Sequence, residues 1–230
     1  MKTIGLIGGM SWESTATYYR LINEGIRNER GGLASAELIL NSLDFSKVVR
    51  LQTEDRWDEA GELLGAAGAR LASGGADCIL ICTNTMHLVA GEVARMSGLP
   101  LIDIIDETAE AIRSAGCRRP LLLATRYTMK HGFYSERMLA QGVDTILPDP
   151  DERHALHRII FEELCTGKIL GGSASAINEM VMQGARRGAD SVILGCTEIQ
   201  LLLNADSLCL PGFDSTRLHA DAAVRFALAA

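Results

Sequence analysis

Two similar stretches decide the fold: GADCILICTNTM at residues 75–86 and GADSVILGCTEI at residues 188–199. They are 188 − 75 = 113 residues apart, close to half of the 230-residue chain. Each is a short apolar run that ends in polar residues, which is typical of a buried parallel strand running into a helix. A weaker correspondence aligns residues 4–8 with residues 120–124. Such a strand also recurs by chance in α/β proteins, so the chemistry at the strand ends has to support the repeat.

Short apolar runs alternate with longer helical patterns along the rest of the chain, which predicts an α/β fold. We expect two pseudo-symmetric lobes, residues 1–98 plus 213–230 and residues 99–212, each a parallel sheet flanked by helices, with the active site in the cleft between them. The expected strands are 3–8, 36–41, 77–82, 101–105, 120–125, 144–147, 191–195 and 208–211. Helices are expected to begin near residues 13, 55, 85, 107, 128, 152, 173, 198 and 215.

Composition excludes several functional classes. The net charge is −7, and acidic and basic residues are mixed, so no basic run offers a track for nucleic acid. No segment approaches the roughly 18 consecutive apolar residues of a membrane span, and the N-terminal apolar run is too short for a signal peptide. We expect a cytoplasmic protein with reduced cysteines. The six cysteines and five histidines show no metal-ligand spacing, so we expect no metal or other cofactor.

A cysteine follows the apolar run of the second stretch. Cys196 lies at the predicted start of a helix, and Thr197 adds a hydroxyl donor beside it. The positive end of a helix dipole stabilises a thiolate, so we expect a lowered pKa for the Cys196 thiol. A thiol in this position indicates a catalytic role.

The first stretch carries a hydroxyl at the equivalent position. The 113-residue offset aligns Thr83 with Cys196, and Cys82 with Gly195. Side chains alternate along a strand, so Thr83 is expected to face the site. Cys82 should then point away and pack as a small apolar residue.

Further polar groups are expected near these strand ends. Asn84 and Thr85 follow at a helix start, where side chains and backbone N–H groups suit a carboxylate. The Gly-Gly-Met-Ser loop around Met10 lacks the Gly-x-Gly-x-x-Gly pattern of a dinucleotide site, so we expect its backbone to approach a small substrate. Thr125 and Thr128 end the corresponding strand of the second half, and either is a hydroxyl donor to substrate or a helix cap.

Three motifs in matching order resemble the aspartate/glutamate racemase family: IGLIGGMSWEST at residues 4–15, CTNTMH at residues 82–87 and GCTE at residues 195–198. The resemblance runs along the whole chain. It implies a homodimeric amino-acid racemase that uses neither pyridoxal phosphate nor metal, acts on a small-molecule amino acid, and places one acid–base group in each lobe.

The resemblance also implies roles for single residues. Cys196 corresponds to the second-lobe cysteine of the family, and Thr83 stands where members carry the first-lobe cysteine. Asn84, Thr85 and Thr197 match positions that bind the backbone groups of the amino acid.

Two departures from the family pattern bear on specificity. The replacement of a thiol by Thr83 is similar to a branch of enterobacterial, broad-specificity amino-acid racemases. Cys165 stands where aspartate-specific members carry a lysine, and Lys168 is displaced from that position. The second departure favours a broader range of amino acids. Gln52 and Arg50 follow a predicted turn and are candidates for side-chain recognition.

The implied mechanism removes the Cα proton of the L enantiomer with Cys196, while Thr83 donates or relays a proton on the opposite face, through water if needed. Two alternatives remain open. One is a single-cysteine decarboxylase or isomerase of the same superfamily, and the other is a non-catalytic amino-acid-binding protein. Deuterium exchange at Cα of a panel of amino acids separates the three.

Overall fold

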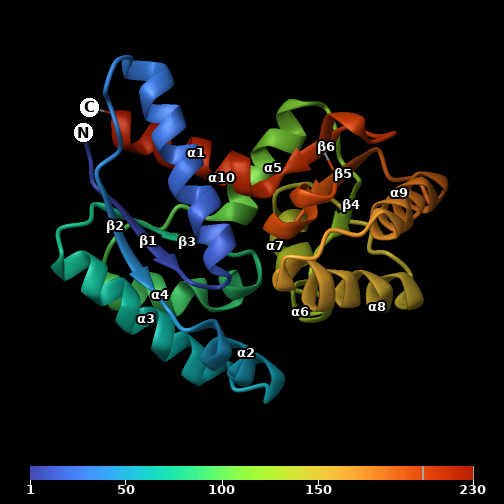
Figure 1. Ribbon diagram of the computed structural model, residues 1–230, viewed down its shortest axis with the longest axis horizontal. Helices are drawn as coiled ribbons and strands as arrows, with labels where there is room; N and C mark the ends of the chain where they lie inside the picture. Colours follow the sequence, from blue (N-terminus) through green and yellow to red (C-terminus); the bar gives the residue numbers. More distant parts are fainter. Residues whose placement is uncertain (204, 230) are drawn as a thin grey trace. The chain divides into compact units, whose positions relative to one another are not determined.

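A computed structural model describes residues 1–203 and 205–229 (Figure 1). Contacts divide the chain into two units, which we describe separately. The first unit consists of Met1–Asp103 with His219–Ala230, and the second of Ile104–Leu218. No helix in the described part of the chain is long and apolar enough to cross a membrane.

The first unit is built on a parallel sheet. Its strands are β1 (Ile4–Gly8), β2 (Leu38–Ser42) and β3 (Cys78–Ile81), in the order β2-β1-β3. The helices of this unit are α1 (Trp12–Arg30), α2 (Phe45–Thr53), α3 (Trp57–Ser73), the 3-10 helix η1 (Thr85–Val89), α4 (Ala90–Ser97) and most of α10 (Ser215–Leu228).

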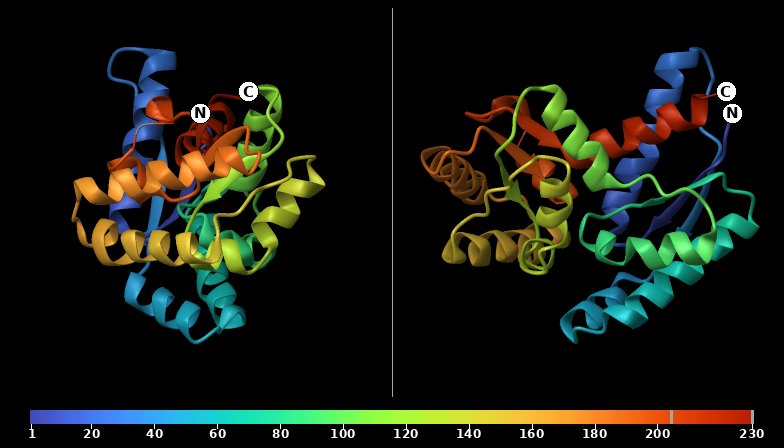
Figure 2. Two further views of the ribbon diagram at one scale, coloured as in Figure 1. Left: turned by 90° about the vertical axis from the view of Figure 1, so that its right-hand side faces the viewer. Right: turned by 180° about the vertical axis from the view of Figure 1, so that it is seen from behind.

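Both faces of this sheet are buried, which explains why β1 and β3 are continuous apolar runs. Ile79 and Ile81 of β3 pack in one cluster with α3 and α4. Leu80 and Cys82 pack in the other cluster, with α1 and α10. Figures 1 and 2 show α3 and α4 side by side beneath the sheet and α1 across its other face.

The second unit repeats this plan with three parallel strands. They are β4 (Pro120–Leu123), β5 (Ser191–Leu194) and β6 (Gly212–Asp214), in the order β4-β5-β6. The helices that surround this sheet are α5 (Ile104–Ser114), α6 (Arg126–Lys130), α7 (Phe133–Ala140), α8 (Pro150–Arg158), the π-helical turn η2 (Ile159–Glu163), the 3-10 helix η3 (Leu164–Thr166), α9 (Gly171–Arg186) and the 3-10 helices η4 (Thr197–Leu201) and η5 (Ala205–Ser207). The prediction of two lobes, each a parallel sheet flanked by helices, is confirmed.

Strand register confirms the internal repeat. Ile4 lies opposite Cys78 in the first sheet, and Pro120 lies opposite Ser191 in the second. The offset between the equivalent positions of β3 and β5 is 191 − 78 = 113, the value read from the sequence. Matching hydrogen bonds continue the correspondence past the strands. The amide of Cys82 donates to Ile7 at 3.0 Å, and the amide of Gly195 donates to Leu123 at 2.8 Å.

Two expected strands at 101–105 and 144–147 are reduced to single bridges. Leu101 pairs with Ile79, and Ile146 pairs with Leu121. Ile104 and Ile105 instead form the buried first turn of α5. A short apolar run does not distinguish a buried strand from a buried helix segment, which explains the wrong prediction.

Two further predictions about elements are wrong. The expected strand 208–211 is not one, and β6 begins directly after it, at Gly212. The turn expected before Gln52 is helix α2, which Asp44 caps by accepting a hydrogen bond from the Ser46 amide at 3.0 Å.

The bounds of the two units follow from strand pairing. The first unit extends to Asp103 because Leu101 is bridged to β3, and the second extends to Leu218 because β6 pairs with β5. The sequence-based division places these bounds earlier, at 98/99 and 212/213. The N-terminal residues and the end of α10 belong to the first unit, where the Lys2 amide donates to the Ala227 carbonyl at 3.0 Å.

Candidate functional site

The first unit gathers its candidate residues after the end of β3. Thr83 is half-buried, and Asn84 and Thr85 are buried as the chain turns into η1. Cys82 is fully buried in the cluster with α1 and α10, in agreement with the prediction that it packs as an apolar residue. Burial raises the pKa of the Cys82 thiol, so this thiol is protonated.

His87 fixes the turn that carries Thr83. Its Nδ1 is 2.8 Å from the Thr83 carbonyl oxygen, so the ring donates from Nδ1 and holds this part of the backbone. A second buried histidine, His219, stacks edge-on with His87 at 5.7 Å between ring centroids. Its Nδ1 is 2.8 Å from the Tyr18 hydroxyl and its Nε2 is 2.8 Å from the Ile102 carbonyl. This buried network fixes the backbone that follows β3.

Gln52 and Met10 both lie near the segment that follows β3, but Gln52 makes a polar side-chain contact there and Met10 makes apolar ones. Gln52 is buried on α2, and its Nε2 lies 3.0 Å from Sδ of Met86, which follows Thr85. Met10 is buried in the apolar cluster with α3 and α4. Arg50 is exposed on α2. Of the two candidates for side-chain recognition, Gln52 therefore has a described contact with the CTNTMH segment, through Met86.

The loop after β1 approaches its neighbours closely. Gly9 has φ of 85°, and a Cβ there would lie 2.1 Å from the Leu43 carbonyl oxygen. Its amide donates to the Thr15 hydroxyl at 2.8 Å. Only glycine fits this backbone, which explains the Gly-Gly sequence.

The second unit places the Cys196 thiol beside a carboxylate. The Cys196 thiol donates to Oε2 of Glu198 at 3.0 Å, and the Thr197 hydroxyl donates to the same oxygen at 2.7 Å. Cys196 and Glu198 are 7% and 6% exposed. The sequence predicts Cys196 and Thr197 but misses Glu198, although its spacing of two residues from the thiol in GCTE was the available signal.

The expectation of a lowered thiol pKa is wrong. Burial raises the pKa of the Cys196 thiol well above its ordinary value, and the charge of the Glu198 carboxylate and its hydrogen bond raise the pKa further. The helix that follows is a five-residue 3-10 helix, η4, too short to supply a substantial dipole. The resting thiol is therefore protonated, and Glu198 is placed to accept its proton.

Cys165, Thr125 and Thr128 lie in the second unit too. Cys165 is half-buried in η3, which packs against η4, and its thiol is close enough to Cys196 to contribute to the raised pKa of that group. Thr125 caps α6, because its hydroxyl accepts from the Thr128 amide at 3.4 Å. The two hydroxyl oxygens are 3.2 Å apart. Lys168 is exposed.

The chemistry available is proton transfer. Polar side chains follow β3 in the first unit and β5 in the second, at equivalent positions, and the second unit adds a thiol–carboxylate pair. Among the residues that the structure describes, no cluster of three or more His, Cys, Asp or Glu side chains is arranged to hold a metal ion.

Comparison with known proteins gives consistent results. The family model for Asp/Glu/Hydantoin racemases matches residues 7–223. A protein from Yersinia pestis, crystallised as a candidate Asp/Glu racemase, is 46% identical over 100% of both chains, with a TM-score of 0.93. An aspartate racemase homologue from Pyrococcus horikoshii OT3 is 34% identical over 99% of both chains, with a TM-score of 0.84. The broad specificity amino-acid racemase RacX of Bacillus subtilis is 22% identical over 75% of this chain and 74% of its own.

Proposed function

We propose, because the chain belongs to the Asp/Glu/Hydantoin racemase family, that it interconverts the L and D forms of amino acids without a cofactor. At the level of the family it is an amino-acid racemase, and therefore an isomerase. The finer proposal is that Cys196 and Thr83 are its two acid–base groups, that its substrate range extends beyond aspartate and glutamate, and that it works as a cytoplasmic homodimer.

The observation that carries this proposal is the pairing of Cys196 with Glu198. A cysteine that only packs in an apolar core does not need a buried carboxylate beside it. A cysteine that acts as a base must first lose its thiol proton, and Glu198 is placed to accept that proton. The equivalent position in the first unit holds Thr83, which is half-buried and lies on a backbone segment fixed by His87.

Proton transfer begins when the Cys196 proton moves to Glu198. The thiolate then breaks the Cα–H bond of the L amino acid and becomes a thiol again, leaving a carbanion. A water molecule at the Thr83 hydroxyl delivers a proton to the opposite face of Cα and gives the D amino acid. Exchange with solvent restores the proton on that side and removes the one on Glu198. The proposal requires both strand ends to reach one substrate molecule.

The negative charge that develops on the substrate carboxylate requires fixed donors. Asn84, Thr85 and Thr197 follow the two strand ends and are the donors that we propose for the α-carboxylate. Thr125 and Thr128 are further hydroxyls for substrate in the second unit. Met10 and Gln52 complete the proposed site in the first.

The proposed breadth of substrates rests on two neutral residues, Cys165 and Gln52. Cys165 is neutral and stands where the resemblance puts a lysine in aspartate-specific members. Without a lysine at this position, the proposed site has no cation there to favour a substrate side-chain carboxylate over an uncharged substrate side chain. Gln52, which is buried beside Met86, offers a neutral amide to the substrate side chain.

Chiral chromatography of a panel of L and D amino acids, incubated with dialysed, chelator-treated protein, tests this proposal. We expect aspartate, glutamate and several neutral amino acids to approach equal amounts of both enantiomers. Release of CO₂ from an arylmalonate without racemisation of any amino acid would assign the chain to single-cysteine decarboxylation. Binding of amino acids without any turnover would make it a binding protein. Rescue of activity by a metal would contradict the absence of a cofactor.

A further inference from the structure

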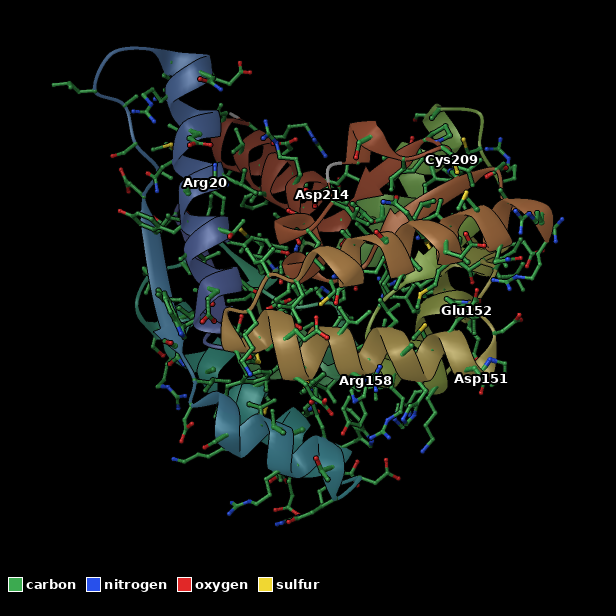
Figure 3. All side chains as sticks on the ribbon, turned by 45° about the vertical axis from the view of Figure 1, so that its right-hand side comes forward. Arg20, Asp151, Glu152, Arg158, Cys209 and Asp214 are labelled. Carbon is green, nitrogen blue, oxygen red and sulfur yellow. The ribbon has the colours of Figure 1, made fainter. Side chains whose placement is uncertain are left out.

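A pocket of about 220 Å³ lies between α6 and α8, and its lining is rich in cations. Arg126, Met129 and Lys130 come from α6. Pro150, Arg153 and His154 come from α8. Figure 3 shows α8 along its length, with Asp151 labelled near its start and Arg158 at its end.

These cations lack acidic partners. Several arginines elsewhere on the protein pair with carboxylates, as Arg20 does with Glu24 at 3.0 Å and Arg137 with Asp106 at 2.6 Å. Within residues 1–203 and 205–229, by contrast, Arg126, Lys130 and Arg153 form no ion pair. The Nε atom of Arg153 is buried and has no hydrogen-bond partner among the described residues.

The nearby acidic residues do not neutralise the pocket. Asp149 and Glu152 bind Arg187, at 2.8 Å and 3.0 Å. Asp151 precedes Arg153 by two positions on α8, so these two side chains point about 200° apart around the helix, while Asp151 lies one turn from His154. No described carboxylate therefore forms an ion pair with Arg126, Lys130 or Arg153, on a protein whose net charge is −7.

The lowered pKa of His157 is consistent with a positive electrostatic potential in this region. Burial, the charge of Arg126 and that of His154 lower the pKa of His157 to about 4, so the ring is neutral at pH 7. Its Nδ1 accepts from the Arg126 amide at 3.4 Å. This contact ties the end of α8 to the start of α6, so the pocket is held from both helices.

We propose that this pocket binds a small anion with two or more negative charges, either a phosphoryl compound or a polycarboxylate. Two guanidinium groups offer forked donors to adjacent oxygens, Lys130 adds a point charge, and Met129 and Pro150 form an apolar wall. The volume suits a small molecule, and the cations are confined to two short helices, which disfavours a nucleic acid as occupant.

The proposed site is separate from the residues assigned to racemisation. Thr128 is buried and follows Arg126 by two positions on α6, so it points to the other side of that helix. Arg126 and Lys130, one helical turn apart, share the exposed side.

Isothermal titration of the full chain with inorganic pyrophosphate and, separately, with citrate at constant ionic strength tests the proposal and distinguishes the two sources. We expect saturable 1:1 binding of at least one of them. Arg153→Gln and Lys130→Gln should each weaken that binding by tenfold or more. Arg20→Gln, which removes the same charge from α1, should leave it unchanged.

Thermal unfolding of each variant without ligand shows whether the variant is folded. Lys130 is exposed, so Lys130→Gln should fold and still tests the site if Arg153→Gln does not fold. Equal weakening in Arg20→Gln would mean diffuse electrostatic attraction and would overturn the site. So would the absence of saturable binding by either anion, or binding of a single-stranded oligonucleotide in place of both.

Discussion

At the scale of single residues, two equivalent positions have different surroundings. Cys196 is buried and donates its thiol proton to Glu198, whereas Thr83 is half-buried and its backbone is held by His87. The sequence predicts both positions, because the repeat fixes their alignment. It could not predict the raised thiol pKa, which depends on burial and on the direction in which Glu198 points.

Replacing the two neighbouring cysteines by alanine tests the strand register. Cys196→Ala should abolish racemisation, because it removes the proposed base, while Cys82→Ala should retain most activity. Cys82 is in the apolar cluster, so its loss should lower only the denaturation midpoint. Rates by chiral chromatography and urea midpoints measure the two effects. An active Cys196→Ala and an inactive but folded Cys82→Ala would reverse the assignment.

Glu198→Gln should lower kcat for the L enantiomer at pH 7 about 100-fold, because the amide cannot take the thiol proton. The carboxylate raises the Cys196 pKa, so its removal should lower that pKa. Activity that needs the thiolate should then rise at lower pH than in the wild type. Glu198→Asp should recover part of the rate. A variant with the wild-type pH profile would show that Glu198 has a structural role only.

Thr83→Cys should raise turnover of the D enantiomer about tenfold, equivalent to ~1.4 kcal/mol of barrier, because a thiol exchanges protons near neutral pH and an alcohol does not. Enantiomers have equal free energy in water, so kcat/KM must stay equal in both directions in every variant. Full time courses from both enantiomers measure this. If Thr83→Cys slows both directions and Thr83→Ala changes neither, Thr83 is not an acid–base group.

At the scale of secondary structure elements, β3 and β5 were predictable and β6 was not. Each of β3 and β5 is a short, mostly aliphatic run that is buried on both faces, as expected for a strand covered by helices on both sides. β6 has only three residues, and its pairing with β5 rather than its own composition makes it a strand. Helix α2 was not predicted from the sequence, because a nine-residue helix gives only a short periodic pattern, although Asp44 is a typical N-cap residue.

The histidine network under η1 makes an element-scale prediction about stability and pH. Burial lowers the pKa of His219 to about 3, and the charge of His87 contributes to that shift. Below pH ~6.5 the unfolded chain binds a proton at this histidine that the folded chain does not bind, so stability falls as the pH drops from ~6.5 toward 3.

Urea unfolding between pH 6.5 and 4 should therefore show a smaller loss of stability in His219→Gln than in the wild type, by about 1 kcal/mol per pH unit. Tyr18→Phe is the matched control. It removes the hydrogen bond between Tyr18 and His219 but keeps the titrating group, so it should lower stability while keeping the wild-type slope. Equal slopes in the wild type and His219→Gln would refute this origin of the pH dependence.

At the scale of the whole molecule, the chain builds the same unit twice. β3 pairs with β1 and is bridged to Leu101, and β5 pairs with β4 and β6 in equivalent register. The helix after Leu101 is α5, which begins the second unit, and the helix after β6 is α10, most of which belongs to the first. Composition and the repeat were sufficient to predict this plan. They could not place the unit bounds, because the bridge of Leu101 and the short β6 are visible only through pairing.

The central claim is that the Cα proton leaves one face and returns from solvent on the other. The most direct measurement is early turnover of L-aspartate or L-glutamate in D₂O, followed by chiral separation and mass spectrometry. The account predicts that newly formed D amino acid carries deuterium at Cα, while the remaining L amino acid keeps protium. D product that retains protium, or L substrate that gains deuterium without any D product, would contradict proton transfer between two groups.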